Sequence, residues 1–177
     1  MKIPKIINQE EFEKLFQASL KKKGSKAKAY SLALLLGFEA GMRISEIVGL
    51  KSHVPPLQKE HVDLQQHTIK IVSGKGNKDR VVPLPKRFNQ GAFNLLPLSN
   101  HLSRRALQQY TTNLGQEVLG KAITFHTLRH GFGSHLASSG RPLHEIQMLM
   151  GHSRLDTTGI YLHANPKQAI EGARDVF

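Results

Sequence analysis

Apolar residues recur at helical spacing near the start of the chain. The apolar positions between residues 9 and 23 share one helical face: Phe12, Leu15, Phe16 and Leu20. Asn8 precedes them, and Glu11 follows three positions later, which is the pattern of a capping box. A run of lysines before Gly24 suits the negative end of a helix dipole. The pattern therefore predicts an amphipathic helix that begins after Asn8 and ends before Gly24.

Helical patterns continue after this segment and return in the second half of the chain. Residues 26–40 are almost continuously apolar toward their end, which predicts a helix at the centre of the core. Gly41 ends this helix, and a short helix is expected from near Ile44. Further helices are expected over residues 99–120, 127–139, 142–150 and 157–163, and residues 164–177 could form one more.

Between the helical parts lies a stretch with strand and turn signals. Two runs rich in β-branched residues, 68–72 and 80–85, flank the turn-rich segment SGKGNKD. Gly74, Gly76 and Asn77 are typical of a hairpin turn. Residues 87–98 show no clear periodicity and are expected to be a loop. The sequence therefore predicts a mainly α protein with a small antiparallel β-sheet, of the α+β class.

The composition narrows the classes of function. A length of 177 residues favours one domain, or one domain with a small appendage. Lys and Arg number 25 against 13 Asp and Glu, so the net charge of +12 indicates a polyanionic partner such as nucleic acid. The absence of cysteine excludes disulfides, thiolate metal sites and a cysteine nucleophile. No apolar run reaches the ~20 residues that a membrane-spanning helix needs, and no secretory pattern follows Met1, so a cytoplasmic protein without membrane association is expected. On composition alone, a ribosomal or general nucleic-acid-binding protein is as well supported as any more specialised function.

The densest group of reactive side chains lies in residues 126–163. His126 and His130 are four positions apart and would share a helix face, as a zinc-binding pair does. The metalloprotease motif needs glutamate directly after the first histidine, where this chain has Thr127, and no cysteine or acidic cluster offers a third ligand. No metal site is therefore predicted. Arg129 lies between the two histidines in a region poor in acids, and a guanidinium there suits a phosphate.

Five short motifs resemble those of the tyrosine recombinases, also called phage integrases. HTLRH at residues 126–130, GHS at 151–153 and TTGIY at 157–161 are similar to the active-site run of that family, with matching intervals. GMRISEI at 41–47 is similar to its first arginine motif, and GKGNKDR at 74–80 to its lysine hairpin. The motifs occur in order across most of residues 4–163, and the likeness is greatest to enzymes of the Xer, integron and phage types. The resemblance implies the tyrosine recombinase catalytic-domain fold.

The resemblance also implies a role for each matched residue. Tyr161 would be the nucleophile that forms a 3′-phosphotyrosyl bond to DNA, and Lys75 the acid that protonates the leaving 5′-oxygen. Arg43 and Arg129 would stabilise the phosphate in the transition state; a simple Arg43–Glu46 ion pair is the alternative for Arg43, and both can hold. The remaining members of the catalytic set are His126 and His152, supported by His130 and Glu46. DNA contacts are expected from Arg104, Arg105, Lys78 and Arg80, and Lys78 is close enough to Lys75 to be confused with it.

As a whole, the resemblance implies a site-specific recombinase that cuts and rejoins double-stranded DNA without metal, ATP or another cofactor. The partners would be DNA and further copies of the chain, as a tetrameric synapse in which the C-terminal tail docks on a neighbour, with a monomer in the absence of DNA. Residues 1–177 would form the catalytic domain alone, without the N-terminal core-binding domain, in the cytoplasm at the nucleoid. The alternatives are a DNA-binding protein with an inactive site, a type IB topoisomerase and a metal-dependent nuclease, the last lacking the carboxylate clusters it needs.

Overall fold

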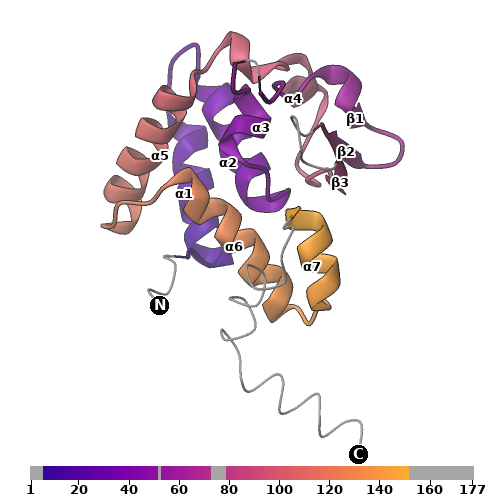
Figure 1. Ribbon diagram of the computed structural model, residues 1–177. Coiled ribbons are helices and arrows are strands. Elements are labelled where there is room, and N and C mark those ends of the chain that lie inside the picture. Colours follow the sequence, from indigo (N-terminus) through magenta and orange to yellow (C-terminus); the bar gives the residue numbers. More distant parts are fainter. Residues whose placement is uncertain (1–5, 52, 73–78, 152–177) are drawn as a thin grey trace, which may run out of the picture.

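A computed structural model describes residues 6–51, 53–72 and 79–151 (Figure 1). The described residues form helices, two short 3-10 turns and three strands, in the order α1 (Gln9–Lys21), α2 (Ala27–Glu39), α3 (Ile44–Val48), η1 (Lys59–His61), β1 (Val62–Asp63), β2 (Thr68–Ile71), β3 (Arg80–Pro83), α4 (Gln90–Asn94), η2 (Leu98–Asn100), α5 (Arg104–Leu119), α6 (Phe125–Ser138) and α7 (Leu143–Met150). Helices therefore dominate, and the predicted α+β class is confirmed. Within these ranges, no helix is long and apolar enough to cross a membrane.

Helix α2 is the centre of the core, as its apolar sequence predicts. Its residues from Ser31 to Phe38 are all buried, and α1, α5 and α6 pack around it (Figure 1). Two glycines bring α2 and α6 close together. A Cβ at Gly37 of α2 would lie 2.7 Å from the Phe125 ring, and one at Gly131 of α6 would lie 2.6 Å from the Phe38 ring. The start of α6 is thereby fixed against the core.

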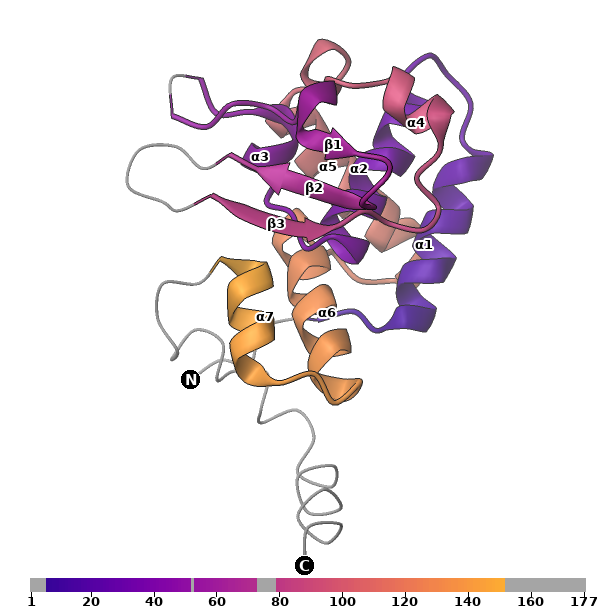
Figure 2. The same cartoon turned by 90° about the vertical axis from the view of Figure 1, so that its right-hand side faces the viewer.

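The sheet is antiparallel with strand order β1-β2-β3, and the predicted hairpin is β2 with β3. Their register pairs Thr68 with Pro83 and Ile71 with Arg80. The short strand β1 was not predicted. Helix α7 packs against both β3 and α6, which places the C-terminal end of the described chain beside the sheet (Figure 2).

Helix boundaries differ from the sequence prediction in three places. The expected loop over 87–98 contains α4, which begins where the Asn89 side chain accepts the backbone N–H of Ala92. The helix expected from residue 99 begins only at Arg104, because Ser103 caps it. The helix expected from residue 127 begins at Phe125, where Thr124 provides the cap. The capping box of α1 and the span of α7 agree with prediction, whereas the helices expected over 157–163 and 164–177 lie outside the described residues.

Candidate active site

Three of the predicted catalytic residues line one pocket. The pocket has a volume of about 190 Å³ and is formed by the α2–α3 junction, α5 and the start of α6. Its lining residues are Met42, Arg43, Ile44, Ser45, Gln108, Phe125, His126 and Arg129. Arg43 and Arg129 are 86 positions apart in sequence, so only the packing of α6 on α2 brings their guanidinium groups to the same place. The result is a concave site with two fixed positive charges and an imidazole.

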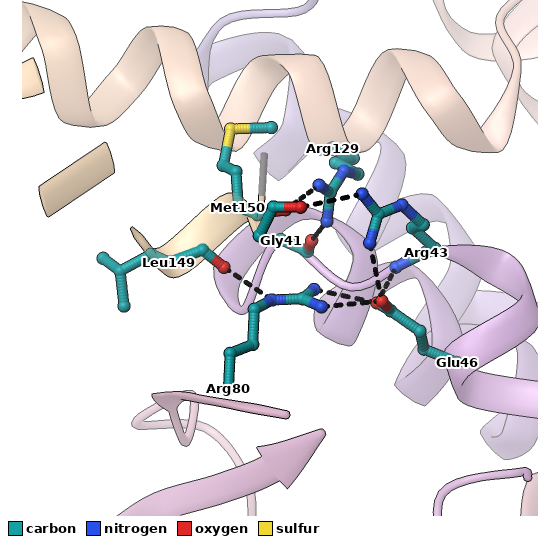
Figure 3. A network of polar contacts seen from close by, with 8 residues as sticks. Gly41, Arg43, Glu46, Arg80, Arg129, Leu149 and Met150 are labelled. Carbon is teal, nitrogen blue, oxygen red and sulfur yellow. Dashed lines mark hydrogen bonds and ion pairs between the residues drawn. The ribbon is translucent and has the colours of Figure 1, made fainter. Parts of the chain in front are cut away.

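Arg129 is a buried cation that donates hydrogen bonds to two backbone carbonyl groups. Its side chain is 2% exposed, and its Nη1 and Nη2 atoms donate to the carbonyl oxygens of Gly41 and Met150 (Figure 3). A carbonyl oxygen orients a guanidinium but carries no net charge. These bonds therefore fix the Arg129 guanidinium at the pocket, where it can bind an anion.

Arg43 is held by Glu46, as the sequence predicts for this pair. Glu46 Oε2 accepts the backbone N–H of Arg43 at 2.7 Å, and Oε1 accepts Nη1 at 2.9 Å. The Arg43 side chain remains 35% exposed, so it reaches both the buried carboxylate and the pocket. Its Nη2 also lies 3.4 Å from the carbonyl oxygen of Gly151.

His126 and His130 lie on the same face of α6, with ring centroids 4.4 Å apart and the rings edge to face. Burial, followed by the positive charges of Arg129 and Arg43, lowers the pKa of His126. Burial, His126 and Arg129 lower the pKa of His130 to about 4. Both rings are therefore neutral at pH 7, each with one nitrogen that donates and one that accepts. A neutral imidazole beside two arginines can take part in proton transfer.

The neutral state of His130 predicts an acid-sensitive fold. Because the pKa of His130 is about 4 in the folded chain and about 6.5 in an unfolded one, only the unfolded chain gains this proton as the pH falls from 6.5 toward 4. The contribution of neutral His130 to the free energy of unfolding is therefore complete above pH 6.5. It is lost progressively as the pH falls from 6.5 toward 4. In urea titrations, His130→Gln should reduce the loss of unfolding free energy between pH 7 and pH 5 by up to about 1 kcal/mol, after allowance for solvent screening. An equal loss in both proteins would contradict this.

Arg80 does not have the exposed position expected of a DNA contact. Its side chain is 6% exposed, and the guanidinium forms two hydrogen bonds with Glu46, of 2.7 and 2.9 Å (Figure 3). Arg80 shares a strand face with the buried Val82, because alternate residues of β3 point to the same side. The structure places Arg80 in a buried ion pair with Glu46, and not at the surface where a DNA contact was expected.

The other predicted DNA contacts that the structure describes are at the surface. Arg104 and Arg105 are exposed in the first turn of α5. With the exposed Lys51 and His101 they line a groove of about 680 Å³. Lys75, Lys78, His152 and Tyr161 lie outside the described residues. Gln108 also lines the pocket and was not predicted, because only the long-range packing of α5 on α6 brings it there.

Candidate metal ligands are scarce in the part of the chain that the structure describes. That part contains no group of three or more histidine, cysteine, aspartate or glutamate residues that could hold a metal ion. Glu46 is the carboxylate beside the site, and Arg43 and Arg80 both bind it. The ionisable residues that line the described pocket are thus two arginines and a histidine.

Comparison with known proteins gives a consistent result. The pattern of the phage integrase family matches residues 5–168. The tyrosine recombinase XerA of Thermococcus kodakarensis is 34% identical over 175 residues, covering 90% of this chain and 58% of that protein. This chain therefore spans less than two thirds of that relative's length.

Two solved structures share the fold. A crystal structure of XerA recombinase superposes with a TM-score of 0.74 at 23% identity, covering 99% of this chain and 66% of the other. The XerH site-specific recombinase bound to palindromic difH substrate, a post-cleavage complex, superposes with a TM-score of 0.67 at 23% identity, covering 97% of this chain and 53% of the other. Together with the family match over nearly the whole sequence, these likenesses show that this chain belongs to the phage integrase family.

Proposed function

We propose that this chain is the catalytic part of a site-specific DNA recombinase that cuts and rejoins double-stranded DNA without metal or ATP. The hydroxyl of Tyr161 would attack a backbone phosphorus and form a 3′-phosphotyrosyl bond while the bond to the 5′-oxygen breaks. The phenol proton leaves to a base, and Lys75 gives a proton to the departing 5′-oxygen. Rejoining is the reverse reaction, which needs no ATP because the phosphotyrosyl bond retains the energy of the one it replaced.

The observation that carries this proposal is the pocket shared by Arg43, Arg129 and His126. Negative charge grows on the non-bridging phosphate oxygens as the nucleophile attacks. Fixed donors at such oxygens contribute about 3–4 kcal/mol each, by analogy with oxyanion holes. Two arginines can therefore supply the stabilisation that a metal ion gives in other phosphoryl-transfer sites. His126, neutral at pH 7, would assist proton transfer and hold a phosphate oxygen, and His152 would add a further donor.

Double-stranded DNA is the proposed substrate, as the net charge of +12 and the substrate named for the XerH complex suggest. The exposed arginines at the start of α5 would bind backbone phosphates, because a helix N-terminus adds favourable partial charge there. The family resemblance further suggests that the chain works as a tetramer on DNA, with the C-terminal tail of one copy docked on the next.

The proposed contacts at α5 predict a change in salt dependence. Each phosphate contact contributes about −0.9 to the slope of log K against log salt. Arg104→Ala with Arg105→Ala should therefore make the slope shallower by about two, measured by fluorescence anisotropy with duplex DNA. The control is Lys21→Ala with Lys23→Ala, which removes the same charge at the end of α1. An equal change in the control would show that overall charge, and not these contacts, governs binding.

A trapping experiment tests the proposed reaction. The probe is a pool of duplexes with a randomised central segment and a nick, so that the short 5′-hydroxyl fragment diffuses away after cleavage. Adducts stable to SDS are recovered, and sequencing of their DNA gives the preferred site. We expect adducts to form equally with and without EDTA. Cleavage that stops in EDTA and returns with Mg²⁺ would indicate a nuclease, and adducts without sequence preference would indicate a topoisomerase.

A further inference from the structure

Arg80 contacts helix α3 and the end of α7, two parts of the fold that bind the arginines of the pocket. It lies at the start of β3, where the register pairs it with Ile71. Its Nη1 and Nη2 bind the two oxygens of Glu46, at 2.7 and 2.9 Å, and its Nε donates to the carbonyl oxygen of Leu149 at 2.8 Å. One buried guanidinium thus connects the sheet, the helix α3 and the end of α7 (Figure 3).

Glu46 carries the effect of Arg80 to Arg43. The carboxylate is 4% exposed and binds both arginines through the same oxygen, Oε1. Burial alone would raise the pKa of Glu46, but the hydrogen bonds and charges of Arg80 and Arg43 hold it below the usual value. Without Arg80, Arg43 would be the remaining cation bound to this buried charge in the described structure. Its guanidinium would then be drawn toward Glu46 and away from the pocket.

The end of α7 is bound by three arginines at three successive carbonyl groups. Leu149 accepts from Arg80, Met150 from Arg129, and Gly151 lies 3.4 Å from Nη2 of Arg43. Gly151 has a left-handed φ of +59°, and a Cβ there would lie 2.9 Å from Cδ of Arg80. Arg80 therefore packs against the residue that directly precedes His152. The C-terminal end of a helix carries partial negative charge, which favours this arrangement.

We infer that Arg80 is a positioning residue for the cleavage reaction, acting through Glu46 on Arg43 and through Leu149 on the end of α7. The inference rests on the catalytic role proposed for Arg43. Because the Arg80 side chain is buried, it is not expected to contact DNA. Its loss should therefore lower the rate of the chemical step and leave DNA affinity unchanged. A shift of about 1 Å in a catalytic group can slow a reaction about 10²-fold.

Two variants test the positioning role of Arg80. The substrate is a nicked duplex that carries the preferred site identified in the trapping experiment. Arg80→Met removes the guanidinium and keeps the apolar stem. Arg80→Lys keeps the charge but lacks the planar group that binds both carboxylate oxygens and the carbonyl together. At saturating protein, Arg80→Met should cleave about 10²-fold more slowly than the unmodified chain, with Arg80→Lys between them and the Kd for DNA unchanged. Thermal unfolding shows which variants fold, and Arg80→Lys carries the test if Arg80→Met does not.

A second substrate separates positioning from general loss of structure. It has a methylphosphonate at the scissile position, where a methyl group replaces one charged oxygen, so that a guanidinium matters less. The defects of Arg43→Ala and of the Arg80 variants should shrink together on this substrate. The double variant Arg43→Ala with Arg80→Lys should be slowed on the phosphodiester by clearly less than the product of the two single defects, because part of the effect of Arg80 passes through Arg43.

The possible failures are distinct. If Arg43→Ala is relieved on the methylphosphonate and the Arg80 variants are not, or if both Arg80 variants cleave the phosphodiester at the unmodified rate, Arg80 has no positioning role. If Arg43→Ala itself cleaves normally, the proposed role of Arg43 is wrong, and the inference on Arg80 is overturned with it. If the unmodified chain forms no adduct with any duplex, the proposed function fails.

Discussion

Replacement of Tyr161 by phenylalanine should abolish covalent protein–DNA adducts and leave DNA affinity within a few fold. Phenylalanine keeps the ring but lacks the oxygen that would bond to phosphorus. A free tyrosine phenol has a pKa of about 10, so the reaction depends on cations and bases that Tyr161→Phe leaves in place. SDS gels with the nicked duplex measure adduct formation, and fluorescence anisotropy measures DNA affinity on the same protein preparation.

A matched control comes from Tyr110, which stacks on Tyr30 within the fold. Tyr110→Phe should form adducts at a rate close to that of the unmodified chain, because its hydroxyl has no role in the proposed chemistry. An adduct that persists in Tyr161→Phe would mean that another residue is the nucleophile. Loss of DNA binding in the same variant would instead point to a structural role for this tyrosine.

Replacement of Lys75 by alanine should slow cleavage of an ordinary phosphodiester about 10²–10⁴-fold, which is the usual contribution of a general acid. The defect should disappear when sulfur replaces the bridging 5′-oxygen, because a thiolate leaves without a proton. Arg43→Ala and Arg129→Ala should not be rescued in this way, since they act on the non-bridging oxygens. Single-turnover cleavage of the two duplexes measures the rescue.

Lys78→Ala is the matched control for Lys75 and is expected to weaken binding mildly. Rescue by sulfur in Lys78→Ala, but not in Lys75→Ala, would shift the assignment three residues along the hairpin. If neither variant shows rescue, the proton comes from His126 or from water, and the proposed role of Lys75 is wrong.

Local sequence signals were sufficient for much of the fold. The apolar period around Phe12 and the Asn8–Glu11 capping box predict α1, and β-branched runs around a glycine-rich turn predict the β2–β3 hairpin. The sequence predicted the ends of helices less accurately than the helices themselves, because a single capping residue decides where a helix begins. Thr124 and Ser103 each move a helix start, and neither stands out from the polar residues around it. Strand β1 has only two residues, too few for a period.

The residues of the candidate site that belong to a recognisable motif could be predicted from the sequence. The motifs point to Arg43, His126 and Arg129, and the structure brings these three together. The burial of Arg80 was not predictable from a motif. Charge alone predicts an exposed arginine, and its partner Glu46 is 34 positions away in sequence, so no local pattern reveals the pair. The two-residue alternation with Val82 is the signal that would have placed Arg80 inside.

The most direct test of the proposed mechanism is to identify the residue that is bonded to DNA. Adducts formed in EDTA by the unmodified chain are digested with trypsin and nuclease, and the modified peptide is sequenced by mass spectrometry. The account predicts a nucleotide attached through its 3′-phosphate to Tyr161. A nucleotide on any other residue, or one attached through a 5′-phosphate, would contradict it.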